Sequence, residues 1–203
     1  MKTLGIVGGV ASGKSLVSQY LSELGAGVLD ADKASHEVLA NDPHVHDALV
    51  NRWGRSILND AGQIDRKAVA TRLFADANDP AGEDRKFLEK LLHPRIRERL
   101  DEQRQAFARE GRPAVVLDAP LLLEALWGPM CDVIVMVDAP REMRLAHASE
   151  RGWTEAEFDR RESAQWPVEE KRRHATVVLE NVGSPADLRD AARQIWSEHV
   201  QQP

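Results

Sequence analysis

The stretch Gly8-Gly9-Val10-Ala11-Ser12-Gly13-Lys14-Ser15 decides the fold class of this 203-residue chain. It matches the pattern G-x-x-x-x-G-K-[ST] at every fixed position. An apolar run at residues 3–7 precedes it, and a segment with helical spacing of apolar residues, 14–24, follows it. A buried strand that turns through glycines into a helix directs backbone N–H groups and the positive end of the helix at a bound phosphate. The sequence therefore predicts a phosphate-binding loop.

The last two residues of this stretch indicate what the loop binds. In loops of this kind the lysine reaches the β- and γ-phosphates and the following hydroxyl ligates Mg²⁺. We therefore expect ATP or GTP as the ligand, with Lys14 at the phosphates and Ser15 at the metal ion. The alternative, a glycine-rich turn without a ligand, is disfavoured by the complete motif and its context. Without a nucleotide, Lys14 is expected to be a solvated charge.

The rest of the chain alternates between predicted strands and predicted helices. Four more short apolar runs predict strands at 27–30, 113–117, 131–137 and 176–179. Helical spacing predicts helices at 34–39, 42–53, 67–74 and 186–200, and further helix within the charged segment 141–174. Residues 84–110 predict one long amphipathic helix in which Pro94 marks a kink or a break, and most of 54–82 is expected to be loop. This alternation indicates an α/β fold with a parallel sheet.

Composition and charge narrow the class of protein. Apolar residues make up 42% and charged residues 30%, as in ordinary globular proteins, which excludes a wholly disordered chain. The formal net charge of −6 argues against a nucleic-acid partner, although a local cluster of donors can still bind a phosphorylated small molecule. Cys131 is the only cysteine, so no internal disulfide forms, and no Cys/His cluster has zinc spacing. We expect no membrane partner and a reducing, cytoplasmic location, because no stretch reads as a membrane span or a signal peptide.

Acidic residues follow three of the predicted strands: Asp30 or Asp32, then Asp118, then Asp138. The ligand crevice of an open α/β sheet lies beyond the carboxyl ends of its strands, where a carboxylate can hold Mg²⁺ or accept a proton. Asp118 follows Ala-Val-Val-Leu, resembles a Walker B acid and is our candidate metal ligand. Each acid could instead cap the helix that follows it. The charged segment 141–174 predicts either a mobile helical lid whose arginines reach phosphates or a solvated helical pair.

Further motifs in the chain resemble the dephospho-CoA kinase family. In chain order they are the phosphate loop, Asp30-Ala31-Asp32, Asp65-Arg66, His93-Pro94 with Ile96, Pro120-Leu121-Leu122-x-Glu124, Arg151, Ala164-Gln165 and Asn181. The loop alone indicates only a nucleoside triphosphate, and the sequence contains no Asn-Lys-x-Asp motif that would read guanine. The Asp-Ala-Asp, His-Pro and Pro-Leu-Leu-x-Glu motifs together are specific to this family, and the matches run through most of the chain.

The resemblance implies a kinase of three parts. A P-loop nucleotide-binding core would comprise residues 1–30, 111–139 and 175–203, a three-layer α/β/α arrangement around a five-stranded parallel sheet of the nucleoside-monophosphate-kinase kind. Residues 31–110 would form a helical substrate domain that binds dephospho-CoA, and residues 140–174 a helical lid. The implied reaction uses ATP and Mg²⁺ and moves the γ-phosphate to the ribose 3′-hydroxyl of dephospho-CoA. This is the last step of coenzyme A biosynthesis, and the resemblance implies nothing about oligomeric state.

The same resemblance assigns roles to individual residues. Asp32 matches the catalytic carboxylate, which can orient the ribose hydroxyl and accept its proton, and acts together with Lys14. The residues expected at the nucleotide are Gly9, Ala11, Ser12, Gly13, Lys14, Ser15, Leu16, Arg144, Arg151 and Asn181. The residues expected at dephospho-CoA are Asp32, Arg66, His93, Arg95, Pro120 and Leu121. His93 could instead be a helix N-cap or a buried structural histidine, and Arg66 could pair locally with acidic neighbours.

The sequence departs from the usual family pattern close to the expected nucleotide. Ala11 replaces a common glycine of the loop, which is tolerable if its φ is negative. Leu16 replaces a threonine, so a second hydroxyl near the phosphates is lost. In the lid, the usual Gln, Arg and Arg are here Arg144, His147 and Arg151. Their spacing puts all three on one helix face, so we predict that Arg144 makes the nucleotide contact that His147 cannot make.

Two other functions fit the same motifs. Another small P-loop kinase, acting on a nucleotide or a small alcohol, would share the core, because acceptor choice lies in residues 31–110. A non-catalytic ATP-binding protein is disfavoured by the intact Lys14, Ser15 and Asp32, since a protein that only binds ATP has no need of the carboxylate. An assay of ADP release with and without dephospho-CoA separates these functions.

Overall fold

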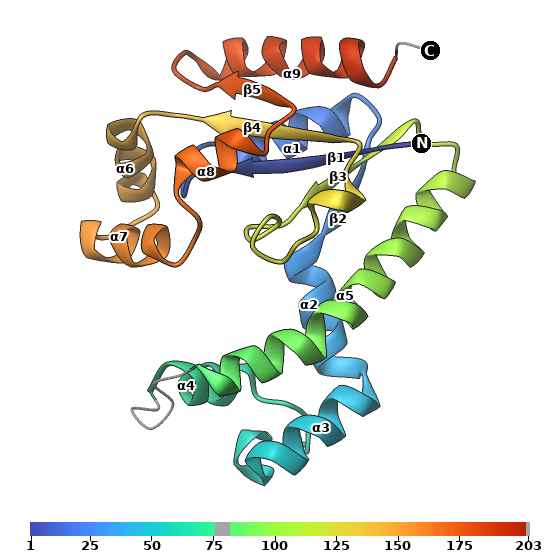
Figure 1. Cartoon of the computed structure of the whole chain (residues 1–203), viewed down its shortest axis with the longest axis vertical. Coiled ribbons are helices and arrows are strands. Elements are labelled where there is room, and N and C mark those ends of the chain that lie inside the picture. The colour runs from blue at the N-terminus through green and yellow to red at the C-terminus, as the bar shows by residue number, and fades with distance from the viewer. Residues whose placement is uncertain (76–81, 202–203) are drawn as a thin grey trace. The chain divides into compact units, whose positions relative to one another are not determined.

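Five parallel strands form one sheet, in the order β2-β3-β1-β4-β5 (Figure 1). The computed structural model describes residues 1–75 and 82–201. The strands are β1 (Lys2–Gly8), β2 (Gly27–Asp30), β3 (Ala114–Asp118), β4 (Val133–Asp138) and β5 (Val177–Glu180). Each strand overlaps a predicted one, so the predicted α/β fold with a five-stranded parallel sheet is confirmed. β1 lies at the centre, and the phosphate loop therefore starts from the most buried strand.

Both faces of the sheet are covered, which explains why its strands are almost wholly apolar. On one face, Leu4 and Ile6 of β1 pack with Leu21 of α1 (Lys14–Glu23) and Trp196 of α9 (Pro185–His199). The opposite face meets the end of α5 (Glu83–Arg109) so closely that a Cβ on Gly27 would lie 2.5 Å from the Phe107 ring. Helices and loops on both faces make the three-layer arrangement that the sequence predicted.

The remaining helices also overlap the predicted ones. They are α2 (Ala31–Asn41), α3 (Pro43–Trp53), α4 (Arg66–Ala75), α6 (Arg141–Glu150), α7 (Glu155–Ser163) and α8 (Val168–Arg173), with short 3-10 turns at Arg55–Ile57 and Gly128–Met130. Two helix starts follow from local sequence. Asp42 accepts hydrogen bonds from the backbone N–H groups of His44 and Val45, and Ser184 forms a capping box with Asp187. The part of the predicted loop at 76–81 lies outside the described residues.

Two differences from the sequence predictions concern helix ends. α2 begins directly after β2, at Ala31 rather than Ala34, which places Asp32 in its first turn, where the helix dipole favours an acid. α5 runs through Pro94 as one helix, so the break that proline suggested does not occur. His93 therefore lies inside α5, and the alternative that it caps a helix is wrong.

The chain divides into two compact units, residues 1–30 with 103–203 and residues 31–102. The first unit contains the sheet, and the second contains α2, α3, α4 and most of α5. In the second unit the Asp84 carboxylate is 7% exposed and accepts hydrogen bonds from Arg52 Nε at 2.7 Å and Arg72 Nε at 3.1 Å. Burial disfavours its charge, but the hydrogen bonds outweigh burial and hold the pKa of Asp84 below its ordinary value. The pair of arginines thus joins α3, α4 and α5 through one carboxylate.

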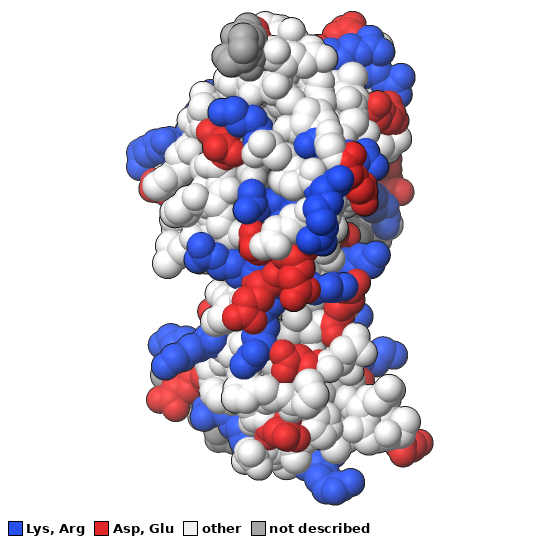
Figure 2. Space-filling model, turned by 90° about the vertical axis from the view of Figure 1, so that its right-hand side faces the viewer, with Lys and Arg blue, Asp and Glu red and all other residues white. Residues whose placement is uncertain are grey.

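The surface carries both signs of charge. Figure 2 shows lysine and arginine interspersed with aspartate and glutamate over the face in view, as expected from 27 basic and 33 acidic residues. Within residues 1–75 and 82–201, no helix is both long enough and apolar enough to cross a membrane.

Candidate active site

The phosphate loop connects the end of β1 at Gly8 to the start of α1 at Lys14. Gly13 occupies the N-cap position with φ of 102°, a left-handed conformation that glycine adopts without strain. A side chain at Gly13 is also excluded by space, since its Cβ would lie 2.6 Å from Nδ2 of Asn181. The predicted strand, loop and helix are therefore all present, and the segment that contains Asn181 packs directly against the loop.

Lys14 is not the solvated charge that the sequence suggested. Its ammonium donates to the backbone carbonyls of Gly8 at 3.1 Å and Gly9 at 2.7 Å. Burial, followed by repulsion from Lys171, lowers the pKa of Lys14 from 10.5 to about 8, and the carboxylate of Asp118 only partly offsets these effects. The structure therefore gathers positive charge around the lysine that the motif assigns to the phosphates.

Two more predicted nucleotide residues contact the loop from the C-terminal half of the chain, and a third acts on it through its charge. Asn181 is 8% exposed, follows β5 and donates from Nδ2 to the carbonyl of Ser12 at 2.9 Å. Arg144 donates to the carbonyl of Val10. Arg151 is exposed, and its positive charge, like that of Arg144, contributes to the lowering of the pKa of Lys14. The contact of these three residues with a bound nucleotide stays a prediction.

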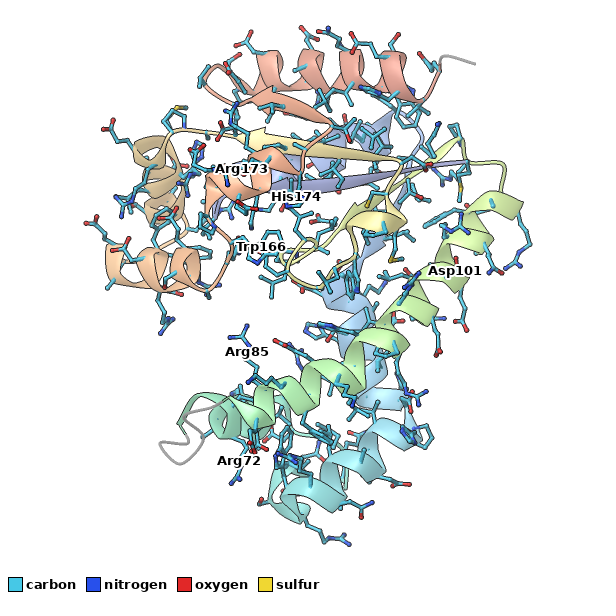
Figure 3. All side chains as sticks on the ribbon, in the orientation of Figure 1. Arg72, Arg85, Asp101, Trp166, Arg173 and His174 are labelled. Carbon is cyan, nitrogen blue, oxygen red and sulfur yellow. The ribbon has the colours of Figure 1, made fainter. Side chains whose placement is uncertain are left out.

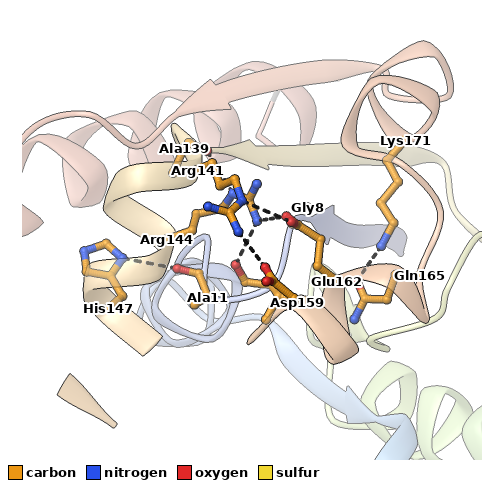
Figure 4. A network of polar contacts seen from close by, with 12 residues as sticks. Gly8, Ala11, Ala139, Arg141, Arg144, His147, Asp159, Glu162, Gln165 and Lys171 are labelled. Carbon is orange, nitrogen blue, oxygen red and sulfur yellow. Dashed lines mark hydrogen bonds and ion pairs between the residues drawn. The ribbon is translucent and has the colours of Figure 1, made fainter. Parts of the chain in front are cut away.

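Arg144 is buried, with 5% of its surface exposed, and its guanidinium is held by protein groups (Figure 4). Nε donates to the carbonyl of Ala139 at 3.1 Å, and Nη1 donates to the carbonyl of Val10 at 3.4 Å. Nη1 also binds the Glu162 carboxylate of α7 at 2.5 Å. The sequence predicted this side chain at the nucleotide but did not reveal these contacts with the backbone of the loop.

Ala11 does not meet the condition under which an alanine would be tolerated without strain, a negative φ. Its φ is 58°, in the left-handed region that an alanine enters only at an energetic cost. The residue is 9% exposed and packs with Val10, Ala148 and Phe158, so its methyl group is part of a small apolar cluster under the loop. The loop backbone thus adopts the left-handed conformation at this position despite the methyl group. Leu16, predicted at the nucleotide, packs against the main core.

Oxygen ligands for a divalent cation lie at the carboxyl ends of β2 and β3. Asp30 and Asp118 are paired in register across these two strands, and the Ser15 side chain is exposed in the first turn of α1. Hydroxyl and carboxylate oxygens are the donors that Mg²⁺ prefers. Within the described residues, no cluster of three or more histidine, cysteine, aspartate or glutamate side chains could hold a metal by itself. The donor set fits a divalent cation that prefers oxygen ligands.

Lys171 belongs to the site although it was not among the predicted site residues. Lys171 lies in α8, is 2% exposed, and pairs with Glu124 at 3.1 Å and Gln165 at 2.7 Å. Burial lowers the pKa of Lys171, while the attraction of Glu124 opposes this effect. Glu124 also accepts the backbone N–H of Trp166, whose ring lies 5.5 Å from that of His174 (Figure 3). Glu124 and Gln165 both belong to the family motifs quoted above. Their presence in those motifs was the one sequence feature that could have pointed to a shared buried partner such as Lys171.

A cavity of about 430 Å³ opens beside Arg144. Its other lining residues include Asp138, Pro140, Arg141, Val168, Glu180 and Val182. Val182 is 58% exposed, so the cavity presents an apolar side chain to solvent next to charged ones. A space of this size and mixed character is typical of small-molecule sites.

The residues predicted at the second substrate fall into two groups. Asp32, Arg66, His93 and Arg95 belong to the second unit, on α2, α4 and α5. Asp32 and Arg66 are exposed, His93 is half-buried, and Arg95 pairs with Asp42 at 3.4 Å. Pro120 and Leu121 are exposed in the turn that follows β3, in the first unit. All of the predicted substrate residues are thus exposed or half-buried.

The sheet order, the loop and the helix that follows it define an α/β phosphotransferase of the P-loop kinase class. A family model described as dephospho-CoA kinase matches residues 2–187. The chain is 37% identical over 199 residues to the dephospho-CoA kinase of Geobacter sulfurreducens, covering 98% of each chain. It superposes on the dephospho-CoA kinase from Campylobacter jejuni with a TM-score of 0.72 at 25% identity, covering 98% of this chain and 97% of that one. The protein TT1252 from Thermus thermophilus gives a TM-score of 0.79 at 35% identity, with the same coverage. The chain belongs to the dephospho-CoA kinase family.

Proposed function

We propose that the chain transfers the γ-phosphate of ATP to the ribose 3′-hydroxyl of dephospho-CoA, giving CoA and ADP. The observation that carries this proposal is the match of the dephospho-CoA kinase model to residues 2–187, which include the intact Lys14, Ser15 and Asp32. In the cell this is the last step of coenzyme A biosynthesis, and we propose that it takes place in the cytoplasm. Another small P-loop kinase activity has no specific observation in its favour.

The cations around the phosphate loop support a role in phosphoryl transfer. Lys14 has a pKa lowered to about 8 by burial and by its cationic neighbours, so its charge is poorly compensated without a ligand. A bound triphosphate supplies the missing negative charge, and the interaction strengthens as charge develops on the transferred group. We propose that Arg151 and the lysine act together on the phosphates. The cavity beside Arg144 is our candidate for the nucleoside part of ATP.

We propose that Ser15 and Asp118 hold Mg²⁺, with Asp30 as a neighbouring carboxylate. The three side chains offer only oxygen donors, which suits this ion. Mg²⁺ held by these residues would neutralise part of the charge on the phosphates. The protein's own contribution is to fix a hydroxyl at the start of α1 and carboxylates at the ends of β2 and β3.

Asp32 is our candidate for the group that activates the acceptor. Asp32 lies in the first turn of α2, where a carboxylate interacts favourably with the positive end of the helix dipole. In the proposed step the ribose 3′-oxygen attacks the γ-phosphorus, its proton passes to Asp32, and ADP leaves in line with the attack. Asp32 thus acts on the acceptor and not on the nucleotide.

The remaining predicted residues are proposed to bind dephospho-CoA. Arg66, His93 and Arg95 offer donors to its phosphates, and Pro120 and Leu121 offer an apolar surface after β3. We further propose that residues 31–110 act as the substrate domain and residues 140–174 as a lid over the nucleotide. Closure of such a lid would exclude water from the reacting phosphate.

The decisive experiment measures ADP release by the purified protein with ATP and Mg²⁺, with and without dephospho-CoA. The proposal requires release that depends on dephospho-CoA; release that depends only on AMP or another acceptor would replace it with the other kinase activity. Asp32→Asn, which keeps the size of the side chain, should lower kcat by about 10²-fold or more while the affinity for ATP stays unchanged. Asp30→Asn is the matched control and should have a smaller effect on kcat. A loss of ATP binding in Asp32→Asn with normal kcat at saturation would make Asp32 a nucleotide or metal ligand.

A further inference from the structure

Side chains hold the carbonyl groups of the phosphate loop, and most of these side chains come from outside it. Each backbone carbonyl from residue 8 to residue 12 accepts a hydrogen bond from a side chain. The donors are Lys14 for the first two carbonyls, then Arg144, His147 and Asn181 in turn. The loop motif explains Lys14 but not the others. The loop therefore depends on side chains that its motif does not specify.

Arg144 is built into this support. Its guanidinium is anchored at Ala139, Val10 and Glu162, and its Cζ lies 5.5 Å from the centre of the Phe158 ring. It also passes directly under Gly9, where an added Cβ would come within 2.9 Å of its Cζ. The loop motif allows any residue at position 9, so phosphate binding alone does not require Gly9. The close approach of Arg144 explains why a glycine stands there.

His147 holds the strained residue of the loop. Its Nδ1 lies 3.1 Å from the carbonyl oxygen of Ala11, and this is a hydrogen bond when Nδ1 carries the proton (Figure 4). Ala11 adopts a φ of 58°, which a non-glycine residue keeps only where its surroundings enforce it. His147 and Arg144 lie three residues apart on α6, so one helix face holds two consecutive carbonyls.

We propose that Arg144 and His147 are positioning residues that hold the phosphate loop in its nucleotide-binding conformation through the carbonyls of Val10 and Ala11. A trans peptide unit is planar, with its C=O and the next N–H pointing in opposite directions. Fixing the carbonyls of Val10 and Ala11 therefore fixes the N–H directions of Ala11 and Ser12. This proposal rests on the proposed function only in taking ATP as the ligand of the loop.

The proposal differs from a direct contact between Arg144 and the nucleotide, which the sequence predicted. A positioning residue shapes the loop before any ligand arrives, whereas a direct ligand acts only in the complex. The two roles therefore differ in the nucleotide-free protein. The experiment uses two readouts, the backbone amide NMR signals of Ala11 and Ser12 without nucleotide and the Kd for ATP without dephospho-CoA.

Arg144→Met is the first variant, because methionine fills a similar volume against Phe158 without any hydrogen-bond donor. We expect the amide signals of Ala11 and Ser12 to move in the nucleotide-free protein and the Kd for ATP to rise by roughly tenfold, as for a lost hydrogen bond from a charged donor. The control is Arg160→Ala: the Arg160 side chain is 76% exposed and lies 4.0 Å from the carboxylate of Glu157 on the same helix. This substitution should leave both readouts unchanged.

Two substitutions of His147 separate the loss of its hydrogen-bond donor from the loss of its bulk. Asparagine can place its Nδ2 donor where the histidine has Nδ1, whereas leucine has the bulk but no donor. His147→Leu should shift the amide signals of Ser12 and raise the Kd for ATP several-fold. His147→Asn should restore both readouts toward the parent. Equal behaviour of the two variants would overturn the role of His147.

A double-mutant cycle with Gly9→Ala completes the test. The added methyl meets an anchored guanidinium in the parent, but in Arg144→Met it meets an unanchored side chain that can move aside. Gly9→Ala should therefore weaken ATP binding in the parent and add little to Arg144→Met. Additive effects, together with unmoved loop signals in nucleotide-free Arg144→Met, would overturn the proposal and make Arg144 a direct ligand. Both readouts omit dephospho-CoA, so a parent that binds ATP but fails to phosphorylate dephospho-CoA would refute the proposed function alone.

Discussion

Replacing Lys14 with methionine should stabilise the nucleotide-free protein while it abolishes phosphoryl transfer. The pKa of Lys14 is about 8 in the folded chain against 10.5 for the free side chain, so the charged form is disfavoured by folding. A shift of this size corresponds to about 3 kcal/mol at pH 7. Methionine keeps the length of the side chain without the charge and should recover up to this amount. For a chain of this length, each kcal/mol raises the midpoint of thermal unfolding by about 2–4 °C.

The pH dependence of unfolding checks the sign of the contribution that Lys14 makes to stability. Because folding lowers the pKa of Lys14, its destabilising effect is complete below about pH 8 and fades as the pH rises toward 10.5. The difference in stability between Lys14→Met and the parent should therefore shrink to about 1 kcal/mol by pH 10. ATP should raise the unfolding temperature of the parent but not that of the variant, since only the parent keeps the ammonium that meets the phosphates.

Thermal unfolding of both proteins at pH 7 and pH 10, with and without ATP, tests this reasoning. Lys90→Met removes an exposed lysine on α5 and should leave the unfolding temperature within about 1 °C of the parent. A Lys14→Met protein less stable than the parent at pH 7 would refute the reasoning. It would mean that the carbonyls of Gly8 and Gly9 stabilise the ammonium more than burial and its cationic neighbours destabilise it.

Two other predictions concern stability, both measured by urea unfolding. Ala11→Val should lower the free energy of unfolding by about 2 kcal/mol or more, because a β-branched residue tolerates a φ of 58° poorly. Ala11→Gly should change the free energy of unfolding by less than about 1 kcal/mol. A valine variant as stable as the parent would contradict the strain argument. Asp84→Asn should lower the free energy of unfolding by about 1–3 kcal/mol at pH 7, since Arg52 and Arg72 lose their shared anion. Because the pKa of Asp84 is lowered, this contribution is complete above the ordinary pKa of 3.8 and is lost as the pH falls through the lower folded value. The difference in unfolding free energy between parent and variant should therefore narrow at pH 3. A difference independent of pH would show that the ion pairs do not stabilise the fold.

The sheet and the loop were predictable because local sequence encodes them. Each strand is a short apolar run, almost wholly buried in β1, β3 and β4, and the loop follows a pattern whose glycines and lysine serve a known geometry. The start of α2 at Ala31 was missed because its first turn, Ala-Asp-Lys, has no apolar periodicity. The continuity of α5 through Pro94 was not predictable, since packing of the flanking turns decides whether a proline interrupts a helix.

The supports of the site were much less predictable than its motif. Nothing local shows that Lys171, one of many basic residues in a charged segment, is buried against Glu124, because that pairing joins parts of the chain far apart in sequence. The left-handed backbone of Ala11 was not predictable from local sequence either. The sequence left the sign of φ open at this residue, and in the turn from β1 into α1 its φ is 58°.

The carbonyl supports of the phosphate loop also set an order of events during synthesis. Arg144, His147 and Asn181 follow the carbonyls they hold by 134, 136 and 169 positions. A ribosome therefore releases the complete motif long before it releases the side chains that shape it. A nascent chain that ends before α6 carries every motif residue, but of the five carbonyl contacts only those of Lys14 can form. The other three contacts form only when the last third of the protein has folded back onto the first strand.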